Sequence, residues 1–110
     1  MLPTFEAENT NLLLSIDDDF LVTNTGFTLE QNRPNPFHES TEIAFSLDEG
    51  DEVTLNIFNS YGSVIRTLVS TYLPTGDYTY SWQADGLPKG LYFYSLTVGG
   101  KMEVKKMVIQ

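Results

Sequence analysis

The chain has 110 residues, of which 41% are hydrophobic, and this is enough for one domain with a single small core. Fifteen acidic residues against six basic ones give a net charge of −9, and this negative field argues against nucleic acid as a partner. The absence of cysteine excludes disulfides and thiolate metal sites, and no run approaches the roughly 18 to 20 apolar residues of a membrane-spanning helix.

Residues 1–26 are predicted to be a linker or the tail of a preceding domain. They combine the apolar run Leu12–Leu14 with the acidic run Asp17–Asp19, and they lack the turn residues found later. A basic start followed by an apolar core is also missing, so this segment does not resemble a secretory signal, and if the natural protein is exported we expect this chain to be a piece of it. Because the apolar run has no obvious partner, it is a candidate for a donated strand.

Residues 27–110 are predicted to form one all-β domain. Phe27–Gln31 is a short strand, and Asn32–Pro36 is a stiff turn, because each proline fixes its own φ and keeps the preceding residue out of the helical region. This turn fixes the direction of Phe37, which we expect to point inward.

Two alternating segments follow, and both are predicted to be strands with one buried face. Thr41–Leu47 and Val53–Ile57 each place apolar residues at every second position, on either side of an acidic turn. We interpret these two strands as a hairpin. Val64–Thr71 is partly apolar on both faces, which is typical of a more central strand.

The last third of the chain is rich in aromatic strands. Tyr78 and Tyr80 alternate with polar residues and are expected to be buried beside Trp82, whose indole is predicted to lie at the centre of the core. Gly90–Val98 is another inward-facing strand, and Gly99-Gly100 joins it as a tight hairpin to the terminal strand 101–110. About seven strands in this length predict an antiparallel immunoglobulin-like or fibronectin-like β-sandwich.

A series of short motifs resembles one known family. The series contains Q-N-R-P-N-P-F at 31–37, P-K-G-L-Y-F-Y at 88–94 and a lysine-containing ending, K-K-M-V-I, at 105–109. In this order it resembles the type A C-terminal sorting domain of cargo exported by the type IX secretion system of Bacteroidetes, over about residues 29–110. The residues that we expect to define the fold are Pro34, Asn35, Pro36, Phe37, Gly62, Gly76 and Trp82.

The resemblance implies a non-catalytic sorting signal for a fused cargo. Its partners would be the outer-membrane translocon or shuttle of the secretion system and a sortase-like peptidase that removes the domain, with no small-molecule substrate and no cofactor. The cargo would pass through the periplasm to the outer membrane, the cell surface or the extracellular space. The residues onto which the family's recognition motifs fall are Pro88, Gly90, Tyr92, Lys101, Lys105 and Lys106.

The lysines suggest a physical form for the signal. Four of the six basic residues fall in the last 22 positions, and a terminal strand at a sheet edge would offer cations and unpaired backbone groups to a receptor. The alternative is that edge lysines only prevent aggregation. Gly90 likewise has a structural interpretation, a turn position with positive φ before the aromatic strand.

Other functions have weaker support in the sequence. The only histidine, His38, lies in a loop and is expected to be exposed, so neither a serine triad nor a histidine metal site is indicated. Calcium is an alternative for Asp17–Asp19 or for the acidic residues of 48–52, and a sugar-stacking platform is an alternative for the tyrosines. The alternative function is an immunoglobulin-like adhesion module, similar to the hook-capping protein, that associates weakly with itself through edge strands.

Overall fold

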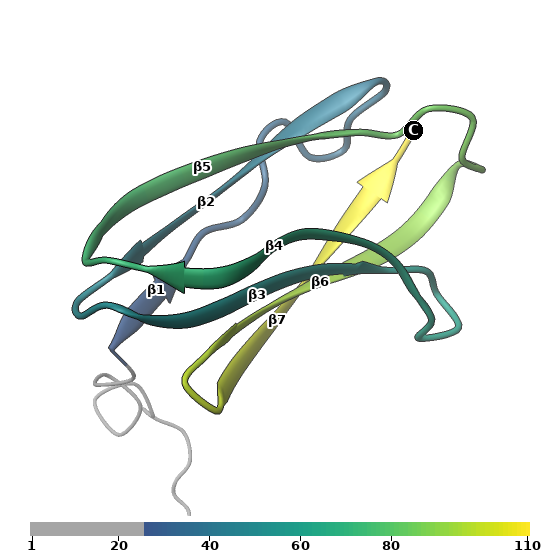
Figure 1. Cartoon of the computed structure of the whole chain (residues 1–110). Coiled ribbons are helices and arrows are strands. Elements are labelled where there is room, and N and C mark those ends of the chain that lie inside the picture. The colour runs from purple at the N-terminus through teal and green to yellow at the C-terminus, as the bar shows by residue number, and fades with distance from the viewer. Residues whose placement is uncertain (1–25) are drawn as a thin grey trace, which may run out of the picture.

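Two antiparallel sheets pack face to face in the computed structural model, which describes residues 26–110 (Figure 1). The three-stranded sheet has the order β1-β2-β5, and the four-stranded sheet has the order β4-β3-β6-β7. The bounds are β1 Phe27–Leu29, β2 Ser40–Leu47, β3 Asp51–Phe58, β4 Val64–Leu73, β5 Gly76–Gln83, β6 Gly90–Val98 and β7 Lys101–Ile109. The predicted seven-strand, immunoglobulin-like or fibronectin-like sandwich is confirmed.

Alternating side chains from both sheets fill the space between them. In β2 and β3 every second residue is buried, as the sequence predicted. Phe37 and Trp82 are both buried, and Phe37 meets the indole edge-on with ring centroids 5.9 Å apart. The hydrophobic core therefore rests on the alternation that is visible in the sequence.

The predicted hairpin between the segments at 41–47 and 53–57 is wrong. β2 pairs with β1 and β5, whereas β3 pairs with β4 and β6, so the turn after Leu47 carries the chain from one sheet to the other. Alternation reveals which face of a strand is buried but not which strand lies beside it. Here the two buried faces oppose each other across the core.

The prediction of a more central strand at 64–71 is also wrong, because β4 is an edge of the four-stranded sheet. Its register against β3 shifts twice: Leu55 pairs with Val69 while the next residue, Asn56, pairs with Thr67, and a second shift follows Ile57. Such bulges change which side chains face inward. Leu68 and Val69 are therefore both half-buried, and the strand looks apolar on both faces.

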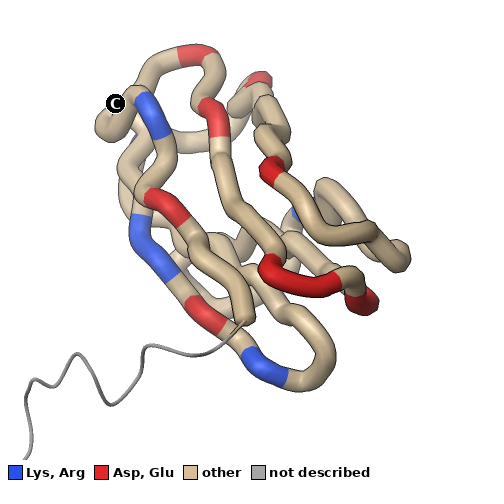
Figure 2. The backbone as a smooth tube through the Cα atoms, turned by 90° about the vertical axis from the view of Figure 1, so that its left-hand side faces the viewer, with Lys and Arg blue, Asp and Glu red and all other residues tan. Residues whose placement is uncertain are grey.

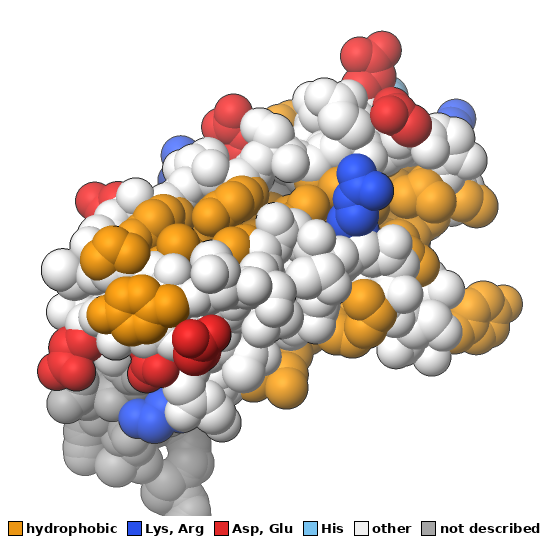
Figure 3. All heavy atoms as spheres, in the orientation of Figure 1, with side chains coloured by type: hydrophobic (Ala, Val, Ile, Leu, Met, Phe, Trp, Pro, Cys, Tyr) orange, Lys and Arg blue, Asp and Glu red, His pale blue; other side chains and the backbone are white. Residues whose placement is uncertain are grey.

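The side of the sandwich formed by β4 and β5 is less closed than the sequence suggested. Tyr78 and Tyr80 were expected to be buried, but they are only half-buried, and both stack on Phe45 at 5.3 Å and 5.9 Å between ring centroids. Figure 3 shows hydrophobic side chains gathered along the border between β5 and β4. An edge strand has no neighbour on one side to cover its aromatic rings.

The terminal strand lies at the other edge of the four-stranded sheet. β7 pairs with β6 over nine consecutive residues without a register shift, from Val98 opposite Lys101 to Gly90 opposite Ile109. Gly99 and Gly100 both have positive φ, as the predicted two-residue turn requires. The expectation that the lysine-rich strand lies at a sheet edge is confirmed.

Residues 26–110 contain no helix that is long and apolar enough to cross a membrane.

Candidate recognition surface

The three terminal lysines lie on one strand but not on one face. Figure 2 shows several basic positions along one side of the molecule, with acidic positions between them and on other strands. Lys106 is exposed on the outer face of the sheet, on the same face as Met102 and Val104. Lys105 belongs to the opposite row and is half-buried, with its Nζ 3.5 Å from Oε2 of Glu103.

The segment 31–37 clasps the C-terminal half of β7, and we call this arrangement the clasp. The Phe37 N–H donates to the carbonyl of Val108 at 3.0 Å, and the Gln110 N–H donates to the carbonyl of Phe37 at 2.7 Å. Two side chains extend it: Nε2 of Gln31 donates to the carbonyl of Lys106 at 2.6 Å, and Oδ1 of Asn35 accepts from the Val108 N–H at 3.0 Å. The proline-rich turn therefore acts as a short partner for the last residues of the chain.

A buried polar cluster holds the clasp in shape. Asn32 is buried, and its Nδ2 donates to Oγ1 of Thr41 at 3.0 Å and to the carbonyl of Pro34 at 3.1 Å. The Thr41 hydroxyl donates to that same carbonyl at 2.8 Å. Buried polar groups are costly unless they are paired, so these bonds favour one conformation of the loop.

Sequence reasoning missed Gln31, Asn32 and Thr41 as functional positions. A signal for Thr41 was present, because it shares the buried alternation of Ile43 and Phe45 and thus brings a hydroxyl to a core position. Gln31 and Asn32 belong to the motif at 31–37, but nothing in the sequence indicated their bonds to Lys106 and Thr41, which lie 75 and nine residues away.

Pro88, Gly90 and Tyr92 form a corner at the start of β6. The Tyr92 hydroxyl donates to the carbonyl of Pro88 at 2.7 Å, the backward bond of a tyrosine corner in immunoglobulin-like sandwiches. Tyr92 is buried against Trp82, and Gly90 has a φ of +140°. This geometry gives the motif a structural role.

The six predicted recognition residues do not converge on one spot. Gly90 and Tyr92 pair with Ile109 and Met107 near the end of β7, whereas Lys101 begins that strand. At about 3.3 Å per residue, eight steps separate the two ends of β7 by about 26 Å. The corner at Pro88–Tyr92 and Lys101 therefore lie near opposite ends of β7.

Two glycines that we expected to define the fold, Gly62 and Gly76, lie at turns. Gly62 has a φ of +87° in the turn after Asn59, whose Oδ1 accepts the N–H groups of Tyr61 and Ser63 at 3.0 Å each. Gly76 opens β5 with a φ of +149°. Positive φ is the property that only glycine supplies without strain, so both positions serve the backbone.

One buried tyrosine has a perturbed titration. The Tyr94 hydroxyl donates to the carbonyl of Glu30 at 2.7 Å, from the four-stranded sheet to the segment after β1. Burial raises the pKa of this phenol from its ordinary value of 10.0 to about 12, with a smaller contribution from the negative charge of Glu103. Tyr94 and Tyr92 are both buried, so neither belongs to an exposed sugar-stacking surface.

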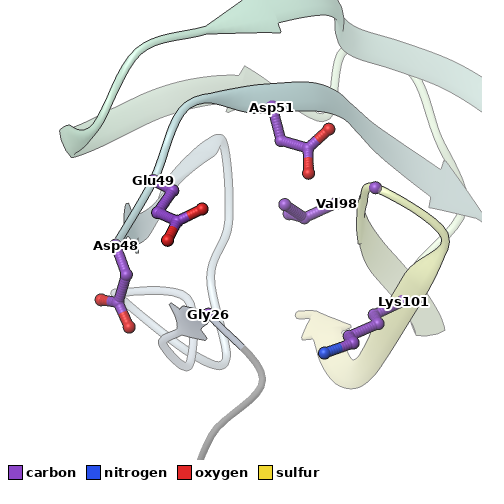
Figure 4. Close-up of a pocket in the computed structure, with 7 residues that line it drawn as sticks. Gly26, Asp48, Glu49, Asp51, Val98 and Lys101 are labelled. Atoms are coloured by element: carbon purple, nitrogen blue, oxygen red, sulfur yellow. The ribbon is translucent and has the colours of Figure 1, made fainter.

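An acidic hollow lies at the end of the sandwich near the β6–β7 turn. Figure 4 shows Glu49, Asp51 and Lys101 around it. Within residues 26–110 no three acidic or histidine side chains are grouped closely enough to hold a metal ion, and the run Asp17–Asp19 lies outside the described residues. His38 is exposed, as expected, with Nδ1 3.1 Å from the carbonyl oxygen of Gln110.

Comparison with known proteins gives one match. A model of the family described as secretion system C-terminal sorting domain matches residues 33–110. The match begins within the clasp and runs through all of β7. A search among curated proteins found no match.

Proposed function

The chain belongs to the C-terminal sorting domains of the type IX secretion system, and we propose that it directs a fused cargo across the outer membrane and is then removed by a sortase-like peptidase. The observation that carries this proposal is the family match over residues 33–110. A sorting signal of this family has a non-enzymatic role and works with the secretion machinery. It belongs to a secreted protein bound for the cell surface or the extracellular space.

The proposed recognition surface is the β7 edge with its lysines. Lys101 and Lys106 are exposed and form no ion pair with another residue of 26–110, so their charges are available to a partner. Lys105 contributes less in this proposal because it faces Glu103. Pro88, Gly90 and Tyr92 act by holding β6, and through it β7, in position.

We place the domain boundary at Phe27, with residues 1–26 as the linker in which the peptidase cuts. β1 begins at Phe27, and the carbonyl of Gly26 accepts the N–H of Asp48 at 2.9 Å. A cut upstream of Gly26 leaves this bond and every described strand intact.

A reporter fusion tests the proposal. The full chain is placed behind a fluorescent protein in a host with the type IX secretion system, and the cell surface, periplasm and medium are assayed. We expect the fusion to reach the surface or the medium, and accumulation in the periplasm would contradict the sorting function.

The double variant Lys101→Glu/Lys106→Glu should reduce export at least tenfold, whereas Arg66→Glu, an exposed charge reversal on β4, should not. Normal export of the double variant would contradict the assignment of the surface but leave the sorting function standing.

Deletion of residues 105–110 is not a suitable test of recognition. It removes Met107 and Ile109, which are both buried, together with every clasp bond to β7. Loss of large buried side chains typically costs several kcal/mol each, so the truncated domain is expected to unfold. Point variants on the surface separate recognition from folding.

Self-association through edge strands is a second candidate, favoured by the partly exposed apolar border between β4 and β5. Sedimentation velocity of the full chain tests it. A concentration-dependent dimer that persists in the Lys101→Glu/Lys106→Glu variant would support a role for this border, whereas a monomer at all concentrations would exclude it.

A further inference from the structure

The four edge strands of the described sandwich differ in how well they accept another strand. β1 has only three residues, and β4 carries two register shifts that disturb its outer row of backbone groups. β5 and β7 are long and regular. Of these two, only β7 carries lysines.

Hydrogen bonds show which backbone groups of β7 point away from β6. The clasp bonds the N–H and C=O of Val108, the C=O of Lys106 and the N–H of Gln110. In a regular antiparallel ladder, every second residue directs its N–H and C=O to the same side. Met102 and Val104 therefore also direct theirs outward, and no other group in residues 26–110 bonds them.

The clasp thus divides the edge into a closed half and an open half. The open half offers the N–H and C=O of Met102 and Val104 and the N–H of Lys106. The side chains of the open half are accessible as well, since Met102 is 63% and Val104 is 53% exposed. A strand added here is about five residues long, because Gln31 occupies the carbonyl of Lys106 at one end and the Gly99-Gly100 turn closes the other.

We propose that the open half of β7 binds a short extended segment of the secretion machinery that carries an acidic residue opposite Lys106 and apolar residues opposite Val104 and Met102. This inference rests on the proposed function and names the chemistry of the partner. Strand addition supplies the backbone bonds, and cross-strand side-chain pairs supply the specificity. Lys101, at the other end of the open half, favours a second acidic residue there.

Charge complementarity selects this partner over a second copy of the chain. Each open half carries Lys101, Lys105 and Lys106 against the single Glu103, so two copies placed edge to edge would bring together two strands of net positive charge. An antiparallel pairing about Val104 would also leave Lys106 opposite Met102 instead of a carboxylate. The open edge of β5 is less suited to an acidic segment, because it carries Asp77 and no basic residue.

Proline substitution at the outward positions gives a matched pair of variants. Val104→Pro removes an N–H that points away from β6, so the ladder within the sheet is retained. Thr79→Pro is the control on β5. The N–H of Ala84 donates to the carbonyl of Glu39, in the chain before β2, so the even-numbered residues of β5 direct their backbone groups to β2. The N–H of Thr79 therefore points away from β2, as the N–H of Val104 points away from β6. Val104→Glu and Thr79→Glu form a second pair, which keeps the N–H and places a negative charge at the same sites.

Export of the reporter fusion is the first measurement. We expect Val104→Pro and Val104→Glu to reduce surface arrival at least tenfold, while both Thr79 variants export normally and all four keep a thermal midpoint within a few degrees of the parent. Normal export by a folded Val104 variant overturns the inference. Failure of the unmodified fusion to reach the surface instead contradicts the proposed function, so the two failures are distinguishable.

Binding is measured on the ¹⁵N-labelled full chain. The probe is the peptide acetyl-Asp-Thr-Val-Thr-Val-Thr-amide, and its control has lysine in place of aspartate. We expect the probe to shift the amide resonances of Met102, Val104 and Lys106, and the control to shift them at least fivefold less. Equal shifts with both peptides would overturn the inference. Slow exchange of the Met102 and Val104 amides before any peptide is added would also overturn it, because it would mean that the chain already covers this edge.

Discussion

At the scale of single residues, the tyrosine hydroxyls show how a family motif can serve the fold. The bond from Tyr92 to Pro88 spans four residues and fixes the chain as it enters β6, next to the buried Trp82. The bond from Tyr78 to Pro74 has the same spacing and the same length of 2.7 Å, but it lies at the exposed border of the sandwich. The two bonds therefore differ mainly in burial.

We predict that Tyr92→Phe lowers the free energy of unfolding by about 1 to 1.5 kcal/mol, because a partly buried carbonyl loses its donor. Tyr78→Phe is the matched control and should cost about 0.5 kcal/mol or less, since water replaces the lost bond. Urea denaturation of both variants provides the measurement. Equal losses in the two variants would mean that burial does not decide the strength of these bonds.

Tyr94 makes a pH-dependent contribution to stability. Burial raises its pKa to about 12 in the folded chain, whereas the unfolded chain has the ordinary value of 10.0. The folded state therefore binds this proton more tightly, and the contribution is complete below pH 10 and is lost as the pH rises to about 12. We expect the free energy of unfolding of the parent to fall relative to that of Tyr94→Phe over this interval. Parallel curves for the two proteins from pH 9 to 12 would contradict the raised pKa.

At the scale of elements, the clasp explains why a motif near the start of the domain and a motif at its end occur together. Asn35 accepts the N–H of Val108 and Phe37 donates to its carbonyl, both on the edge of β7 that faces away from β6, so β7 has a partner at each edge over its last residues. The clasp also confines the open edge to the first half of β7. One segment thus stabilises the terminal strand and limits where another strand can join it.

We predict that Asn35→Ala increases the amide exchange rate of Val108 at least tenfold, because this N–H loses its acceptor. The amides of Met107 and Ile109, which face β6, should change much less. Asn56→Ala is the control, since its side chain accepts a bond from Thr67 on the exposed face without touching β7. A change of equal size at Val108 and Met107 would indicate general loosening of the strand instead of loss of one bond.

At the scale of the whole molecule, the two sides of the sandwich are closed in different ways. On one side the two sheets are joined by the clasp, which includes the parallel bridge between Phe37 and Ile109, and by the bond from Tyr94 to Glu30. On the other side, half-buried side chains of β4 and β5 pack against the core. The edge that carries lysines is therefore on the side where hydrogen bonds join the two sheets.

Local patterns in the sequence were sufficient for the strands, the buried faces of β2 and β3, the Gly99-Gly100 turn and the class of the fold, because alternation and turn chemistry are local properties of the chain. The motif order was also sufficient to indicate the family. Only the tertiary structure decided that β2 and β3 belong to different sheets, that β4 is an edge, and that residues 31–37 cover half of β7. These features depend on which distant segments lie side by side, and the period of a strand carries no information about its neighbours.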